Sequence, residues 1–297
     1  MAIKTVKAII NGQSYDLSYN DGNGKWEASI QAPGQTSFNQ PGGYYNVQIT
    51  AVNDAGTSGS ADASSLEGLK LRVKERVKPV ITITSPTSGA FVTNDNQPII
   101  GTVTDELNGS GVNKATVVVK VDGQPVDNVQ LSDVSNGVQF TATPSTPYGQ
   151  GQHTVTVDAS DNDGNAADQK SVTFTVDTVP PALDVSSPSE GLITNSATIN
   201  VIGTTNDATS SPVTVTISLN DQDQGAVSVS GGGFTKQITL KEGANVIKVV
   251  ATDAAGKSST VIRNVTLDSS VPQITAASIT PNPADAGATI IVSVTIV

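Results

Sequence analysis

Residues 79–89, PVITITSPTSG, recur as residues 181–191, PALDVSSPSEG, and the motif begins once more at residues 272–274, PQI. In the first two copies a proline precedes a run of alternating residues, and a second proline and a glycine follow that run. Alternation with a period of two is typical of a β-strand, and proline and glycine mark strand ends. The recurrence therefore predicts a chain built from several similar β-sheet modules.

A second recurring motif closes each module. The turn sequences VNDAG (residues 52–56), SDNDGN (160–165) and TDAAG (252–256) each follow an alternating apolar run. The resulting period of about 90–100 residues is the size of an immunoglobulin-like sandwich, and no stretch shows a helical period. The sequence thus predicts an all-β protein, an elongated array of tandem Ig-like β-sandwich domains. Residues 79–178 and 179–270 are two such domains, residues 1–78 are an atypical N-terminal Ig-like module and candidate docking domain, and residues 271–297 are a partial β module.

The two ends of the array differ from its middle. The first module lacks the proline-flanked opening and starts at a strand that matches residues 115–122 and 213–220. Residues 271–297 contain only opening strands. We therefore expect unfinished sheets at both ends, whose strand edges accept a strand from a neighbouring chain, including another copy of this chain.

Composition excludes several classes of chemistry. None of the 297 residues is cysteine, so the modules fold without disulfides, and thiol nucleophiles and thiolate metal sites are excluded. The net charge of −11 is uneven, because residues 1–78 carry eight basic and seven acidic side chains and the remainder carries eight and twenty. An acidic body of this kind argues against nucleic acid as a partner. No apolar run reaches the length of a membrane span, and residues 1–11 alternate where a signal peptide is continuously apolar, so we expect neither membrane insertion nor a signal peptide.

Residues 69–78, LKLRVKERVK, predict the closing strand of the first module, with Leu69, Leu71, Val73 and Val77 on one face. The other face carries five basic side chains: Lys70, Arg72, Lys74, Arg76 and Lys78. This basic ladder is a candidate docking surface for an acidic neighbour, such as the second module of another copy. The alternative is that the lysines protect an exposed strand edge from unwanted pairing.

Calcium is the one candidate ion, and no other cofactor is expected. Four aspartates gather near one predicted hairpin, namely Asp158, Asp161, Asp163 and Asp168. Asp105, Glu106 and Asp177 are expected at the same end of the module. Calcium binds six to eight oxygen atoms. The alternative is turn chemistry, because Asp and Asn bond to their own backbone in turns, and the spacing is not that of an EF-hand loop.

The sequence gives no sign of an enzyme. His153 stands in an alternating strand without a Ser, Cys or His partner that the sequence places beside it, and no pair of carboxylates lies in an apolar segment. Aromatic residues concentrate in the first module, where they form either a sugar-stacking platform or ordinary core packing. They are Tyr15, Tyr19, Trp26, Phe38, Tyr44 and Tyr45.

Particular segments resemble known repeats. Residues 79–89 with 97–104, and residues 151–176, resemble the start and end of bacterial Ig-like repeats found in surface and phage proteins. Residues 6–20, VKAIINGQSYDLSYN, followed by GKWEA at 24–28, are similar to Ig-like modules in tail-associated virion proteins of phages that infect Gram-positive bacteria, as is ITPNP at 279–283.

This resemblance implies a non-enzymatic structural component of a phage virion, attached to the tail and projecting Ig-like domains for decoration or adhesion to the host surface. The implied partners are other virion proteins, copies of the chain itself and host-surface glycans. The implied location is the virion, after synthesis in the host cytoplasm. The alternative is a bacterial cell-surface adhesin or a glycan-binding Ig-like array.

Overall fold

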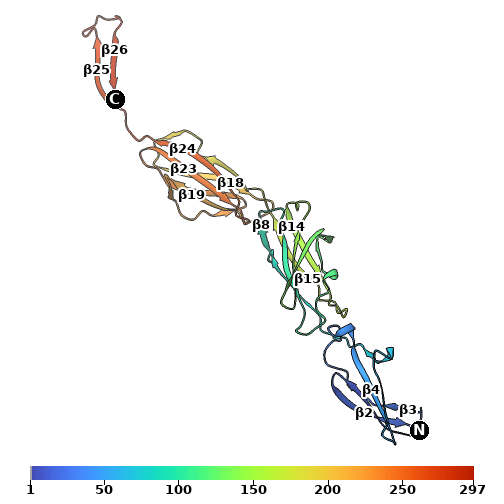
Figure 1. Ribbon diagram of the computed structural model, residues 1–297. Coiled ribbons are helices and arrows are strands. Elements are labelled where there is room, and N and C mark those ends of the chain that lie inside the picture. Colours follow the sequence, from blue (N-terminus) through green and yellow to red (C-terminus); the bar gives the residue numbers. More distant parts are fainter. Residues whose placement is uncertain (1) are drawn as a thin grey trace. The chain divides into compact units, whose positions relative to one another are not determined.

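The computed structural model describes residues 2–297, so that only Met1 of the predicted first module lies outside it. The chain divides into two compact units, Met1–Asp177 and Thr178–Val297. Nearly all regular structure is β, and the few helical segments are the short 3-10 turns Pro41–Gly43, Glu67–Leu69 and Lys114–Thr116 (Figure 1). Within residues 2–297 we find no helix with the length and apolarity that crossing a membrane requires. The predicted all-β class is confirmed.

The first module (residues 2–78) is one antiparallel sheet in the order β3-β2-β1-β4-β5, with β6 also paired to β4. Asn11 and Gly12 both have positive φ, 49° and 76°, as a two-residue type I′ hairpin requires. The buried apolar residues of this sheet are small in number, with Val6, Ala8 and Tyr45 at its centre. Its strands are β1 (Ile3–Ile10), β2 (Gln13–Asn20), β3 (Lys25–Glu27), β4 (Tyr45–Asn53), β5 (Ser58–Ala61) and β6 (Lys70–Leu71).

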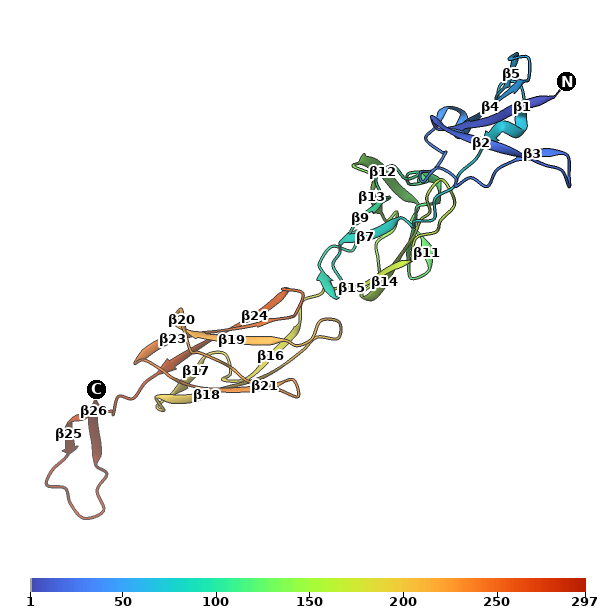
Figure 2. The same ribbon diagram turned by 90° about the horizontal axis from the view of Figure 1, so that it is seen from below.

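The second module (residues 79–177) is a two-layer sandwich (Figure 2). One layer has the order β12-β13-β9-β7, and the other has the order β11-β10-β14-β15-β8, in which only β8 runs parallel to its neighbour. Its strands are β7 (Val80–Ser85), β8 (Ala90–Val92), β9 (Ile99–Thr104), β10 (Val118–Val121), β11 (Gln124–Pro125), β12 (Asn128–Val134), β13 (Gly137–Thr143), β14 (Gly151–Asp158) and β15 (Lys170–Val176).

The third module (residues 178–270) repeats this topology strand for strand, with layers β16-β18-β22-β21 and β17-β24-β23-β19-β20. In both modules the first, third, seventh and sixth strands form one layer. The fourth, eighth and ninth strands form the centre of the other layer, with the fifth and second strands at its edges. Apart from these two short edge strands, this is the strand order of an Ig sandwich. The strands are β16 (Ala182–Ser187), β17 (Leu192–Thr194), β18 (Thr198–Asn206), β19 (Thr214–Leu219), β20 (Gln222–Asp223), β21 (Val229–Ser230), β22 (Gly233–Thr239), β23 (Gly243–Thr252) and β24 (Ser258–Leu267).

Each sandwich closes on a phenylalanine that lies over a strand glycine. Phe140 of β13 is opposite Gly101 of β9 and has no exposed surface. A Cβ at Gly101 would lie 2.2 Å from the Thr82 carbonyl oxygen and 2.4 Å from the Phe140 ring. Phe234 and Gly203 repeat the arrangement in the third module, with a ring contact of 2.4 Å. Only glycine fits at these two positions, because the ring occupies the space of a side chain.

The C-terminal segment is a two-stranded hairpin of β25 (Ile274–Thr280) and β26 (Ile291–Ile296). All residues of both strands are exposed, including Ile274 and Ile291 at 70% and 65%. A hairpin without a further strand or a covering layer is only marginally stable in water. The predicted opening strands are therefore present, and the sheet they begin is not completed within the described residues.

The predicted closing strand of the first module is wrong beyond Leu71. Residues 72–79, here called the connector, are extended but pair with no other strand. The connector accepts one backbone hydrogen bond, from Ser37 N–H to the Val73 carbonyl oxygen (2.8 Å). Its own donors bond to side chains, since Val73 N–H donates to Ser37 Oγ (3.0 Å) and Glu75 N–H donates to Asp163 Oδ2 (3.1 Å). Val77, predicted on the inward face, is 53% exposed.

We expect the substitution Gly101→Ala to lower the free energy of unfolding by about 2–3 kcal/mol, because the new methyl group displaces the Phe140 ring or the β7 backbone. The matched control is Gly149→Ala in the same module, where a Cβ meets no atom within 4 Å. Differential scanning calorimetry of the full chain measures both changes. Equal unfolding temperatures for the two variants would show that the packing of the Phe140 ring does not require glycine at position 101.

Candidate functional site

The connector joins the first module to the loop that follows β14 of the second module. Lys74 Nζ donates to the Asp163 carbonyl oxygen (3.0 Å), and Lys78 Nζ pairs with Asp168 Oδ1 (2.7 Å). Two members of the predicted basic ladder therefore contact the acidic second module of their own chain.

Asp163 is the centre of this junction. Its Oδ2 atom accepts hydrogen bonds from Thr36 Oγ1 (2.5 Å) and from Glu75 N–H, while its own N–H donates to Ser110 Oγ (3.1 Å). Thr36 and Ser110 are buried, at 2% and 3% exposure. Since a buried polar group without a partner is costly, these bonds fix the modules against each other more firmly than the exposed ion pairs do.

The remaining members of the basic ladder do not touch the second module through any ion pair. Lys70 pairs with Glu67 (2.5 Å) and lies 5.3 Å from the centre of the Tyr44 ring. Arg72 and Arg76 are exposed and form no ion pair with any part of residues 2–297. Docking of a separate acidic partner on this surface stays a prediction.

The four aspartates that form the candidate calcium site do not make one carboxylate cluster, and each has its own protein partner. Asp158 pairs with Lys120 (3.5 Å) and accepts from Gln169, and Asp168 pairs with Lys78. Asp161, 1% exposed, accepts from the backbone and side chain of Asn165 at 2.8 and 2.6 Å. That geometry is the turn chemistry given as the alternative. Asp163 belongs to the junction.

A different carboxylate cluster forms at the junction, from Glu75, Asp105 and Glu106. We predicted Asp105 and Glu106 at this end of the module from the sequence, but we did not predict that Glu75 would join them. A signal was present, since Glu75 continues the period of two set by Leu71 and Val73 on the inward face, and it is the one acidic residue among the bases of residues 70–78.

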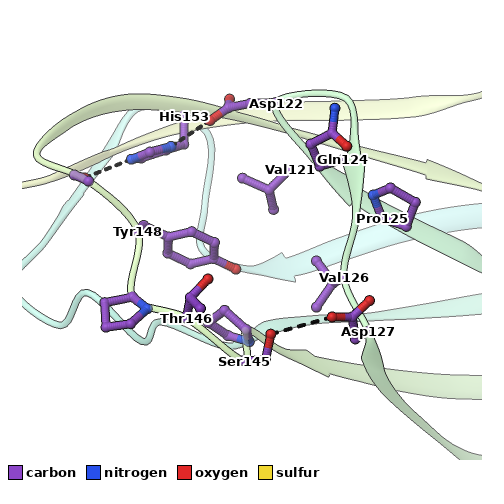
Figure 3. Close-up of a pocket in the computed structure, with 13 residues that line it drawn as sticks. Val121, Asp122, Gln124, Pro125, Val126, Asp127, Ser145, Thr146, Tyr148 and His153 are labelled. Atoms are coloured by element: carbon purple, nitrogen blue, oxygen red, sulfur yellow. Dashed lines mark hydrogen bonds and ion pairs between the residues drawn. The ribbon is translucent and has the colours of Figure 1, made fainter.

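A second candidate site is an open pocket of about 340 Å³ at the opposite end of β14 (Figure 3). Tyr148 forms its wall, and the phenol oxygen is buried without a hydrogen-bond partner. Burial raises the pKa of Tyr148 to about 12, and the nearby Asp122 carboxylate adds to this effect. The phenol therefore remains protonated at neutral pH and has a hydrogen to donate. Other polar lining groups are Asp122, Gln124, Asp127, Ser145 and Thr146.

His153 is held firmly in this pocket. Its Nδ1 lies 2.7 Å from Asp122 Oδ2 and its Nε2 lies 2.8 Å from the Gly149 carbonyl oxygen, so both ring nitrogens face acceptors. Burial acts to raise the pKa of Asp122, but hydrogen bonds from Thr154 N–H and His153 outweigh it and hold this pKa below its usual value. His153 also packs against the rings of Tyr148 and Phe174, which contact each other as well. The sequence missed this site because Asp122 and Tyr148 are brought to His153 only by the fold.

The aromatic residues of the first module do not form one platform. Tyr45 is buried at 4% exposure, Tyr44 lies beneath Lys70, and Tyr19 pairs with Trp26 across β2 and β3 at 5.7 Å between ring centres. The Tyr19–Trp26 pair is the part of the predicted platform that the fold brings together.

We expect Asp163→Ala to loosen the junction, because it removes the acceptor of two buried hydrogen bonds. A loss of about 1.4 kcal/mol would raise the population of the open junction, and hence tryptic cleavage after Lys74 and Arg76, about tenfold. The matched control is Asp168→Ala, which removes only an exposed ion pair and leaves cleavage nearly unchanged. Mass spectrometry of the fragments measures both rates, and equal cleavage of the two variants would contradict the role of Asp163.

Comparison with known families agrees with the two sandwiches. Residues 78–178 match the model of a bacterial Ig-like domain, and residues 181–269 match the model of glucodextranase domain B. Both models describe non-catalytic domains. With the strand order described above, residues 79–270 form two tandem β-sandwiches of Ig-like fold.

Individual proteins show only low sequence identity to this chain. The chain is 28% identical to Bacillopeptidase F of Bacillus subtilis (strain 168) over 173 residues, which are 56% of this chain and 12% of that relative. Among solved structures, the fibronectin(III)-like modules of CbhA from Clostridium thermocellum align with 63% of this chain and 94% of theirs, at 15% identity and a TM-score of 0.40. A 1.5-MDa bacterial ice-binding adhesin aligns with 90% of this chain and 88% of its own, at 20% identity and a TM-score of 0.32.

Proposed function

We propose that this chain is a non-catalytic adhesion protein that binds a surface glycan in the pocket beside Tyr148. The observation that carries the proposal is the phenol oxygen of Tyr148, which is buried, unpartnered and protonated in the wall of an open pocket. This oxygen has almost no accessible surface in the free chain, so in this proposal the Tyr148 ring shifts for a ligand oxygen to reach it. The hydrogen bond gained then removes the cost of an unpaired buried donor.

The lining of the pocket suits a polyhydroxylated ligand. Asp122 and Asp127 supply carboxylate acceptors, Gln124 supplies an amide, and Ser145 and Thr146 supply hydroxyls. Tyr148 adds an aromatic ring with a polar end, the combination that serves at interfaces where one side is apolar and the other wet. A volume of about 340 Å³ lies at the lower end of the range for small-ligand sites, so the pocket fits one terminal sugar better than an extended chain.

The particle that carries the chain is, in this proposal, a phage virion, with the first module attached to the tail and the later modules projecting towards the host. Its support is the resemblance of residues 6–20 and 24–28 to modules of tail-associated virion proteins. The proposed partners are other virion proteins and copies of this chain, and the proposed location is the tail. Mass spectrometry of purified particles tests this placement, which fails if the protein is absent from intact virions.

A second candidate function is that of a bacterial cell-surface adhesin. The observation that favours it is the bacterial Ig-like match over residues 78–178. Recovery of the chain in the cell-wall fraction of a phage-free culture supports this candidate, whereas recovery in particles supports the first. Both candidates use the same pocket.

We expect Tyr148→Phe to abolish glycan binding while leaving the stability of the chain unchanged or slightly higher, because the lost hydroxyl has no partner in the free protein. Binding is measured on an array of bacterial cell-wall glycans, with hits confirmed by isothermal titration calorimetry. Tyr44→Phe in the first module is the matched control and retains binding. If both variants bind as the unmodified chain does, or if no cell-wall glycan binds, the pocket is not the adhesive site.

A further inference from the structure

Three carboxylates meet where the first module joins the second. Glu75 comes from the connector, and Asp105 and Glu106 follow the last residue of β9. One carboxylate oxygen from each lies within 4.8 Å of the other two. Residues far apart in the sequence therefore place three negative charges in a space the size of one ion.

Each of these side chains keeps one oxygen buried and free of hydrogen bonds, namely Glu75 Oε2, Asp105 Oδ1 and Glu106 Oε2. Asp105 as a whole is only 7% exposed. The other oxygens of two residues are anchored by backbone donors, Glu75 Oε1 by Ser110 N–H (2.5 Å) and Asp105 Oδ2 by Gly111 N–H (2.7 Å). The backbone thus holds these two carboxylates in position and leaves one lone-pair face of each unused.

The cluster lacks a counter-charge from the protein. None of the ion pairs formed within residues 2–297 includes Glu75, Asp105 or Glu106. Carboxylates at this separation repel one another, and a buried charge without a partner is strongly unfavourable. A cation bound between them would offset these charges.

The loop around the cluster is shaped to leave room for the carboxylates. A Cβ at Gly109 would lie 2.7 Å from Asp105 Oδ2 and 2.8 Å from Glu106 Cδ, so this position accepts only glycine without moving them. The Gly109 carbonyl oxygen accepts from Asn39 Nδ2 of the first module at 2.6 Å. Both modules therefore support the loop that carries two of the three acids.

We propose that Glu75, Asp105 and Glu106 bind one calcium ion that ties the first module to the second. The donors are all oxygen, which suits a hard cation, and neither histidine nor cysteine is among them, which argues against zinc. A partly buried set of carboxylates suits calcium better than magnesium, because magnesium keeps several of its waters. Since one ligand is in the connector, calcium binding stiffens the junction, and calcium concentration sets how freely the first module moves.

The test uses the full chain after treatment with a chelator. We expect calcium to bind in isothermal titration calorimetry and to raise the unfolding temperature of the unit Met1–Asp177 by about 5–10 °C at a hundredfold excess over the Kd. We expect Glu106→Gln to bind one calcium ion fewer per chain and to lose the calcium-dependent rise in unfolding temperature. We expect the same two results for Glu75→Gln. Without calcium, Glu106→Gln unfolds at the same temperature as the unmodified chain or higher, because one repelling charge is gone.

The matched control is Asp54→Asn, which removes one exposed carboxylate of the first module and leaves calcium binding unchanged. The unfolding temperature of Glu106→Gln measured in chelator separates two roles of this residue. If Glu106 were only structural, the substitution would lower that temperature. An unchanged stoichiometry in Glu75→Gln and Glu106→Gln overturns the proposal, as does magnesium binding equal to or tighter than calcium binding at this site.

Discussion

The packing of one phenylalanine ring over one strand glycine is the contact on which each sandwich depends. Because the chain has no cysteine, the two layers are held without a disulfide, and Phe140 is among the largest fully buried side chains of the apolar core in the second module. Because the ring fills the space above Gly101, β9 and β13 pair in one register only. A slip by one residue would place a side chain where the ring lies and turn each strand's apolar face outward.

A fixed register determines which loops meet at each end of the sandwich. Asp105 follows β9, and Asp161 and Asp163 follow β14, so the loops after these two strands lie together at the end that receives the connector. The pocket beside Tyr148 uses the start of β14 at the other end. The repeated apolar pattern therefore specifies the β-sandwich scaffold. It also fixes where the loops lie, but it does not determine which polar residues those loops carry.

The strands were more predictable from the sequence than the loops, because only the strands carry the alternating apolar pattern. Strand positions such as Ile99–Thr104 and Lys170–Val176 were predictable to within two residues, because alternation reports directly on burial. The closing strand of the first module was overpredicted, since alternation also occurs in an extended connector whose backbone bonds to Ser37 and Asp163. Strand β12 gives a weaker signal in the sequence, because only Val129 and Leu131 pack against the core and polar residues flank them.

The candidate sites were less predictable, because they depend on contacts between distant residues. The aspartates of residues 158–168 looked like a metal site in the sequence, yet the fold gives each a lysine, an amide or a backbone donor. Asp105 and Glu106 instead face Glu75, which is 30 positions from Asp105 in the sequence. No local pattern distinguishes a carboxylate that will find a partner from one that will not.

Side chains of the connector alternate between an outward and an inward face, and charged residues on the two faces have different electrostatic roles. Its outward positions carry Arg72, Lys74 and Arg76, and its inward positions carry Val73 and then Glu75. The outward charges remain in water, where an ion pair such as Lys78–Asp168 contributes little to stability. The single inward charge is partly buried beside two others, where the local dielectric constant is lower and each charge has a larger effect. In the proposed calcium site, Glu75 therefore adds to the hydrogen bonds of Asp163 in coupling the two modules, and it contributes more to that coupling than the exposed bases on either side of it.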